Sequence, residues 1–154
     1  MKSKVKGFIY MLLLISSVGG GYLFRLSLSP VKIIAIHQEG NSSDVLVRNF
    51  PFTDRGKIDW WLKSKDMLME KYSIPKPEKD GDFTIIFWLF GEGYQENDGY
   101  DRLCFGDIPP PQNCIDKNRV FSVNHSRNIG VSFIVSGGIY QEKKDGSIKK
   151  INLD

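Results

Sequence analysis

The sequence of 154 residues has only two cysteines and two histidines, and no acidic residue occurs before Glu39. It contains no serine-hydrolase elbow, phosphate-binding loop, dinucleotide-binding glycine pattern or zinc-protease helix motif. Neither histidine lies near other metal ligands in the sequence, as a metal site would require. We therefore expect a protein that is not an enzyme and that binds no cofactor and no metal.

The positive charge is concentrated at the N-terminus. Of the 21 basic residues, Lys2, Lys4, Lys6 and Arg25 lie in the first 28 positions, which leaves 17 basic and 18 acidic residues in the rest of the chain. The net charge of +3 thus comes from the N-terminal segment. A domain that binds nucleic acid normally carries its positive charge itself, so we exclude nucleic acid as a partner.

Residues 1–28 have the composition of a membrane anchor. The three lysines precede an uncharged run from Gly7 to Phe24, which Arg25 closes. As a helix this run of 18 residues would be about 27 Å long, close to the ~30 Å hydrocarbon core of a bilayer. Lysines before the span predict a cytoplasmic N-terminus and an outward-facing domain, which in a Gram-negative cell is periplasmic.

The alternative for this segment is a cleaved signal peptide. Small residues at Ser17 and Gly19 would suit a signal peptidase. Against cleavage, the apolar character continues through Phe24 and Leu26 instead of turning polar. We favour an uncleaved anchor in the inner membrane, so the lipid bilayer is itself a predicted partner.

Residues 29–154 are expected to form one α+β domain with a mainly antiparallel sheet and a single amphipathic helix. The helix is predicted over Thr53–Tyr72, because apolar residues such as Ile58, Trp61 and Leu68 recur at helical spacing. The pattern does not alternate strands with helices, which favours a mainly antiparallel sheet. The predicted strands are Val31–His37, Asp44–Phe50, Asp82–Phe90, Tyr94–Glu96, Tyr100–Phe105, Val120–Asn124, Val131–Val135, Ile139–Glu142 and Ile148–Leu153.

Three hairpins are expected among these strands. Val31–His37 should pair with Asp44–Phe50 across the polar residues 38–43, and Ile139–Glu142 with Ile148–Leu153 across a turn that contains Asp145-Gly146. Tyr94–Glu96 and Tyr100–Phe105 flank the turn residues 97–99, which predicts a hairpin. Asp82–Phe90 is apolar at nearly every position, so we expect it at the centre of the sheet with the helix on one face.

Cys104 and Cys114 are separated by nine residues that include three consecutive prolines. In an oxidising compartment we expect them to form a structural disulfide. The alternatives are a metal site, which needs further ligands nearby, and redox chemistry, which commonly uses a Cys-x-x-Cys motif that is absent here.

Two other groups are candidates for function. Trp60 and Trp61 are adjacent, so a helix cannot place both on its core face, and one of them is a candidate for contact with a partner. The alternative is packing beneath the preceding segment 50–52. The acidic residues Glu92, Glu96, Asp98 and Asp101 could pair for acid–base chemistry or hold a cation, although their turn-rich surroundings are typical of a solvated hairpin end.

Several blocks of the sequence resemble a known family. They are LSLSPVKIIAIHQEG, NFPFTDRGKIDWWLK, GYDRLCF and NCIDKN. Together with the basic start and the apolar segment, they resemble the enterobacterial putative membrane proteins of domain of unknown function 943. The resemblance extends over almost the whole chain. It implies a small single-pass envelope protein of Gram-negative enteric bacteria and no catalytic residues.

The sequence supports three functional hypotheses. The first is a non-enzymatic periplasmic binding domain on a membrane anchor, one version of which is an immunity protein against an exported toxin. The second is an envelope hydrolase that uses the acidic group. The third is an accessory subunit whose helix docks in a larger membrane complex.

Overall fold

The computed structural model describes residues 2–27 and 29–152, with side chains described for residues 4–22 and 29–152. The chain divides into two compact units, one up to Pro30 and the other from Val31 onward.

The N-terminal unit is a single helix, α1 (Lys2–Ser27). Within it, Lys4–Tyr22 is long and apolar enough to cross a membrane, with a mean hydropathy of 1.3. The side chains in this span are exposed, as expected for a helix whose apolar side chains contact lipid. The predicted N-terminal apolar helix is therefore confirmed, while the side chains of Lys2 and Arg25 lie outside the described residues.

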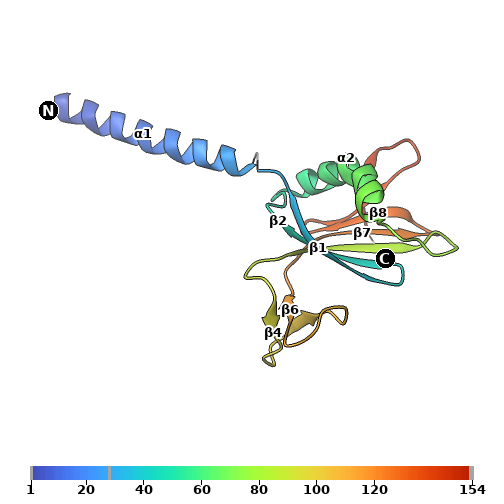
Figure 1. The fold of residues 1–154 in the computed structure, drawn as a ribbon. Coiled ribbons are helices and arrows are strands. Elements are labelled where there is room, and N and C mark those ends of the chain that lie inside the picture. Colours follow the sequence, from blue (N-terminus) through green and yellow to red (C-terminus); the bar gives the residue numbers. More distant parts are fainter. Residues whose placement is uncertain (1, 28, 153–154) are drawn as a thin grey trace. The chain divides into compact units, whose positions relative to one another are not determined.

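The second unit is built on a seven-stranded sheet with the order β1-β2-β3-β7-β8-β9-β10 (Figure 1). All neighbouring pairs are antiparallel except β2 and β3, which run parallel. These strands are β1 (Lys32–Glu39), β2 (Ser42–Arg48), β3 (Phe83–Leu89), β7 (Arg119–Ser126), β8 (Gly130–Val135), β9 (Gly138–Glu142) and β10 (Ile148–Ile151).

The parallel pair is joined by the second helix, α2 (Asp54–Tyr72), so the domain contains one βαβ unit. Apart from this one unit, strands and helices do not alternate in the domain, as the sequence predicts. Parallel strands need a long crossover, and the residues between β2 and β3 provide one. The mainly antiparallel α+β architecture with one soluble helix is confirmed.

Local sequence explains where α2 begins and ends. The Thr53 hydroxyl accepts a hydrogen bond from the backbone N–H of Gly56 at 3.0 Å, which caps the first turn. Ser73 adopts a left-handed conformation (φ 55°), and its backbone N–H donates to the carbonyl of Met69. The buried face of α2 includes Ile58, Trp61 and Leu68, as their helical spacing predicts.

The sheet has a separate apolar core on each face. In β2, Val45 and Val47 point toward α2, whereas Leu46 between them points to the opposite face. The larger core lies under α2, and its fully buried rings are Phe87, Phe121 and Phe133. Burying one such side chain contributes about 1.5–3 kcal/mol, so this core dominates the stability of the domain.

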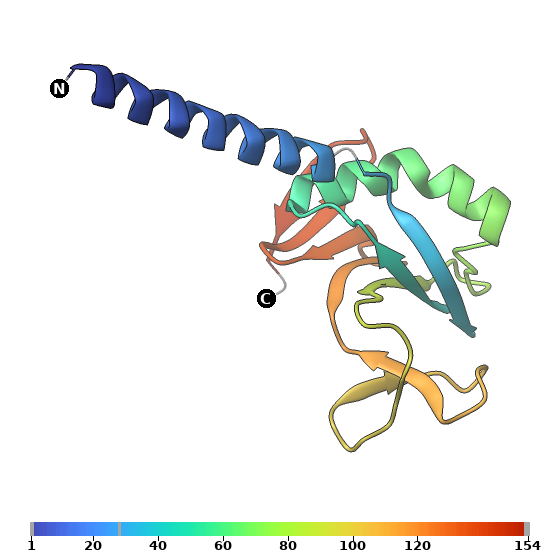
Figure 2. The same cartoon turned by 60° about the vertical axis from the view of Figure 1, so that its left-hand side comes forward.

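The smaller core on the opposite face is covered by a three-stranded sheet with the order β4-β6-β5. Figures 1 and 2 both show α2 and this small sheet on opposite sides of the main sheet. Its strands are β4 (Gln95–Glu96), β5 (Arg102–Cys104) and β6 (Gln112–Asp116).

The predicted hairpin between residues 94–96 and 100–105 is wrong. Both strands pair with β6, which lies between them, and not with each other. Sequence analysis missed β6 because it is short, follows three prolines, and has only two buried residues, Cys114 and Ile115.

Candidate functional site

A pocket of about 310 Å³ lies between the β1–β2 hairpin and the end of β5. It combines residues of the main sheet with residues of the small sheet, and three of its members are carboxylates. The lining residues are His37, Gln38, Glu39, Asp44, Leu103, Cys104, Phe105, Gly106 and Asp107.

His37, on β1, is the central side chain of this site and is 8% exposed. Its Nδ1 lies 2.8 Å from both carboxylate oxygens of Asp107, and its Nε2 lies 2.8 Å from the Tyr94 hydroxyl. Its ring stacks on Phe105, with centroids 3.7 Å apart and an interplanar angle of 13°. In the tautomer with its proton on Nδ1, His37 donates to Asp107 and accepts a hydrogen bond from the Tyr94 hydroxyl at Nε2.

The ionisation of two neighbouring groups is shifted by this environment. Burial raises the pKa of Asp44, although a hydrogen bond from Trp88 Nε1 (2.7 Å) and the nearby His37 act in the opposite direction. Burial also raises the pKa of Tyr94, and the negative charge of Asp107 adds to this effect. Tyr94 is therefore held as a neutral hydroxyl, which suits its role as the donor to His37.

The pocket is better equipped for electrostatic recognition than for nucleophilic chemistry. Glu39, Asp44 and Asp107 bring negative charge, and no lysine or arginine is among the lining residues. Both nitrogens of His37 are already engaged, and Cys104 is bonded to Cys114. Among the described residues, no group of three or more His, Cys, Asp or Glu side chains could hold a metal ion.

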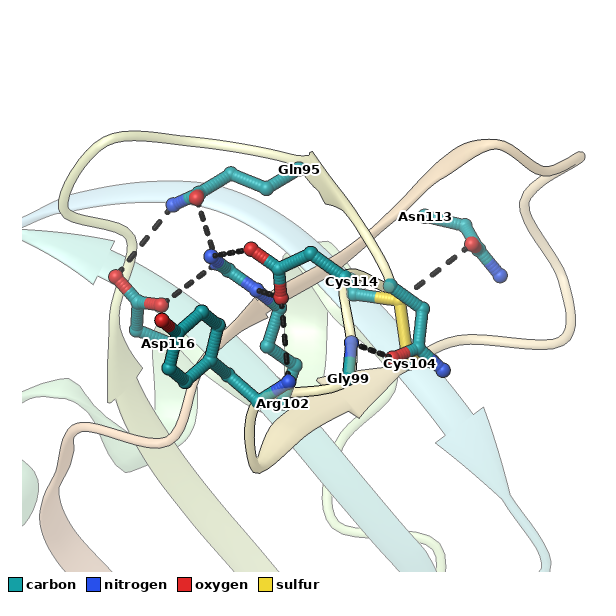
Figure 3. Close-up of polar contacts among 10 residues, drawn as sticks. Gln95, Gly99, Arg102, Cys104, Asn113, Cys114 and Asp116 are labelled. Atoms are coloured by element: carbon teal, nitrogen blue, oxygen red, sulfur yellow. Dashed lines mark hydrogen bonds and ion pairs between the residues drawn. A yellow bond between two sulfur atoms is a disulfide. The ribbon is translucent and has the colours of Figure 1, made fainter.

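Cys104 and Cys114 occupy directly opposite positions on β5 and β6 and are joined by a disulfide with an S–S distance of 2.04 Å. Cys114 is fully buried. The bond, shown in Figure 3, therefore fixes the register of β6 against β5, the strand that contributes Leu103 and Cys104 to the pocket lining.

Next to the disulfide, Arg102 organises a polar network (Figure 3). Its guanidinium donates to Asp98 at 2.9 Å, to Asp116 at 2.7 Å and to the side-chain oxygen of Gln95 at 2.6 Å. The hydrogen bond from Arg102 is the main reason that the pKa of Asp98 is lowered to about 2. This network connects β4, β5 and β6 on the surface of the small sheet.

The structure does not gather the predicted acidic group into one site. Asp98 is held by Arg102 and Asp101 by Lys117, while Glu92 and Glu96 are exposed. Two of the four carboxylates are thus neutralised by different cations, as expected for a surface network.

The two tryptophans both take part in the packing of α2. Trp61 is 3% exposed, and the ring of Trp60 lies 5.0 Å from Phe50 and 5.5 Å from Phe87. Phe50 precedes the helix, so this contact corresponds to the alternative in which the tryptophan packs beneath the entering chain. A role of Trp60 or Trp61 in partner contact is not tested by these positions and stays a prediction.

Sequence analysis did not find the cluster formed by His37, Tyr94 and Asp107. In the sequence, Tyr94 lies 57 positions and Asp107 lies 70 positions after His37, and none of the three belongs to a local motif. No local sequence signal marks this site, because a buried histidine acquires its hydrogen-bond partners only when the chain folds around it.

The chain was also compared with known proteins. Neither a curated protein nor a solved structure matches it. The family model of enterobacterial putative membrane proteins, DUF943, matches residues 2–152, which is nearly the whole chain. The chain therefore belongs to the DUF943 family of enterobacterial putative membrane proteins.

Proposed function

We propose that this protein is a non-enzymatic binding protein whose domain stands on the periplasmic side of the inner membrane, tethered by α1. The observation that carries this proposal is the disulfide between Cys104 and Cys114 in a domain that follows a helix long and apolar enough to span a membrane. Disulfides persist in oxidising compartments such as the periplasm. The lysines at positions 2, 4 and 6 support the same orientation, because positive charge favours the cytoplasmic side.

The polar groups of the pocket support binding rather than catalysis. His37 has no nucleophile among its partners, and it connects β1 to the small sheet through Asp107 and Tyr94. The carboxylates in the lining, with no basic residue among them, favour a positively charged group on the ligand or on a partner protein of the envelope.

The location is tested by fusing a reporter that is active only in the periplasm after Asp154 in the full-length chain. We expect reporter activity, together with complete oxidation of Cys104 and Cys114. Reporter activity in the cytoplasm or free thiols in membranes from growing cells would contradict the proposed orientation.

Binding is tested with a photo-crosslinking amino acid placed at Leu103, which lines the pocket. The matched control places the same amino acid at Asp145, which is exposed in the turn between β9 and β10. We expect a discrete crosslinked product from position 103 that is absent at position 145 and is lost on Asp44→Asn. Equal crosslinking from both positions, or none from position 103, would exclude the pocket as the binding site.

A further inference from the structure

One end of the main sheet carries basic side chains from three strands. β1 begins there with Lys32, which pairs with Arg48 at the end of β2. β7 runs antiparallel to β3 and begins there with Arg119, beside the end of β3. α2 begins near this end as well, because only residues 49–53 separate it from β2. We call this part of the domain the β1-start end.

The three basic side chains have no acidic partner among the described residues. Lys32 and Arg48 lie directly opposite each other, so their like charges repel. Both are exposed, as is Arg119, and none of the three forms an ion pair with a described residue. Arg48 instead lies over the ring of Phe90, 5.2 Å from its centroid. A negatively charged partner outside the domain would relieve this repulsion.

The carboxylates on the first turns of α2 are already paired. Asp54 lies 3.9 Å from Lys57, and Asp59 lies 3.7 Å from Arg55. Glu92, which follows β3, is exposed and forms no ion pair with a described residue. The three unpaired cations outnumber this carboxylate, so the β1-start end keeps an excess of positive charge.

An apolar side chain stands at the same end of the domain. Phe52, in the segment between β2 and α2, is 85% exposed, whereas Phe50 of the same segment is 5% exposed and belongs to the core. No other large hydrophobic side chain among the described residues is exposed to the same extent. Exposed phenylalanine together with lysine and arginine is typical of surfaces that lie in the headgroup region of a membrane.

Lys32 is also close in the sequence to the membrane anchor. The segment from Ser27, the last residue of α1, to Lys32 spans at most about 18 Å when fully extended. The surface of a membrane that α1 crosses is therefore within reach of this end, and the tether keeps it at a high effective concentration. Anionic lipid headgroups at that surface would supply the negative charge that the domain lacks here.

We propose that the β1-start end rests on the anionic lipid headgroups of the membrane that holds α1. Lys32, Arg48 and Arg119 bind the negatively charged headgroups, and Phe52 inserts its ring between them. β1 is about 23 Å long from its first residue to Glu39, which lines the acidic pocket. The contact therefore leaves the pocket at the far end of β1, open to a partner that is not in the membrane.

The test uses the full-length chain in vesicles made of equal parts of phosphatidylcholine and phosphatidylglycerol. A photo-crosslinking amino acid replaces Phe52, and lipid adducts are measured from the mass of the intact protein. The matched control places the same amino acid at Asp145, an exposed residue in the turn between β9 and β10 at the opposite end of the sheet. We expect at least about fivefold more lipid adduct from position 52 than from position 145.

Two changes then remove the electrostatic attraction. Vesicles of phosphatidylcholine alone should lower the adduct at position 52 by about fivefold or more, because each basic residue near an anionic surface strengthens binding by roughly that factor. In the mixed vesicles, the triple variant Lys32→Gln, Arg48→Gln and Arg119→Gln should have the same effect. Its matched control carries the same change in charge at exposed lysines elsewhere in the domain, Lys76→Gln, Lys79→Gln and Lys144→Gln, and should keep the adduct.

Folding of each variant is checked by the oxidised state of the Cys104–Cys114 pair. The proposal is overturned by equal lipid adducts from positions 52 and 145, or by an adduct at position 52 that neither the neutral vesicles nor the Lys32, Arg48 and Arg119 changes reduce. Crosslinking of position 52 to a second copy of the chain instead of lipid would also overturn it. None of these outcomes depends on which side of the membrane the domain stands or on a ligand in the pocket, so the test is independent of the proposed function.

Discussion

At the scale of single residues, His37 connects the main sheet to the small sheet. It lies on the first strand after the anchor, yet its partners Tyr94 and Asp107 come from the segment between β3 and β7. Its hydrogen bonds and its stacking on Phe105 fasten the small sheet to the edge of the main sheet. The shape of the pocket therefore depends on this one side chain.

Replacing His37 with alanine should lower the free energy of unfolding by about 2–3 kcal/mol, because it removes two partly buried hydrogen bonds and a stacked ring. The measurement is denaturant unfolding of the full-length chain in detergent, followed by tryptophan fluorescence. The control is His125→Ala, since the His125 side chain is 29% exposed and lies 3.7 Å from its nearest carboxylate oxygen, on Asp82. A loss for His125→Ala as large as that for His37→Ala would contradict this role.

The pair of Asp98 and Arg102 predicts a defined pH dependence. The folded-state pKa of Asp98, about 2, lies below its ordinary value of 3.8. A lowered pKa means that the stabilisation is complete above pH ~4 and is lost as the pH falls toward 2. In Asp98→Asn this acid-dependent part should disappear, so unfolding curves of the two proteins should converge between pH 4 and 2.

The titration of Asp98 can also be observed directly by NMR of the carboxyl carbon. In Arg102→Gln we expect its pKa to rise toward 3.8, because the hydrogen bond from Arg102 is the largest cause of the shift. An unchanged low pKa in this variant would show that another group holds the carboxylate.

At the scale of secondary structure, the sequence predicted best where the signals are local. Thr53 predicted the start of α2, and the spacing of Ile58, Trp61 and Leu68 predicted its buried face. The hairpin between β9 and β10 follows from Asp145-Gly146, whose turn is closed by Lys143 and Ser147.

Features that depend on distant residues were not predictable in this way. The parallel pairing of β2 with β3 is decided by how α2 crosses the sheet, and no residue within either strand encodes it. The placement of β6 between β4 and β5 has the same origin. The site around His37 could not be found because its three members meet only after both sheets have formed.

The cap of α2 gives a prediction at this scale. Thr53→Ala should lower the free energy of unfolding by about 1 kcal/mol, because the N–H of Gly56 loses its acceptor. Thr53→Ser keeps the hydroxyl and should retain most of the stability in the same unfolding measurement. Equal losses in the two variants would mean that the methyl group, and not the cap, is responsible.

The disulfide gives a second prediction for the small sheet. Replacing both Cys104 and Cys114 with serine should cost about 3 kcal/mol, the entropy of closing a loop with a separation of ten residues. Hydrogen exchange should show the loss mainly at the amides of β5 and β6. Backbone amides in β7 and β8 serve as the internal reference, and equal loss of protection there would contradict a local effect.

At the scale of the whole molecule, the charges that flank the anchor should control on which side of the membrane the domain stands. Changing Lys2, Lys4 and Lys6 to glutamate removes the positive charge before α1 and should shift chains toward the opposite orientation. The oxidation state of Cys104 and Cys114 is then a direct measure, because thiols stay reduced in the cytoplasm. We expect a clear increase in free thiols.

The matched control changes Lys143, Lys149 and Lys150 to glutamate, which makes the same alteration in net charge within the domain. This variant should keep its cysteines fully oxidised. If it produced as many free thiols as the N-terminal variant, overall charge rather than its position would determine the orientation.

The chain segment that forms the small sheet begins at the end of β3 and ends at the start of β7, and these two points are adjacent in the main sheet. Trp88 at the end of β3 pairs directly with Arg119 at the start of β7, so residues 90–118 form an insertion between two adjacent strands. An insertion of this kind can change in length and sequence during evolution without disrupting the pairing of β3 with β7. We therefore expect residues 90–118 to be exchangeable as one unit between members of the family, with the main sheet keeping its fold after the exchange.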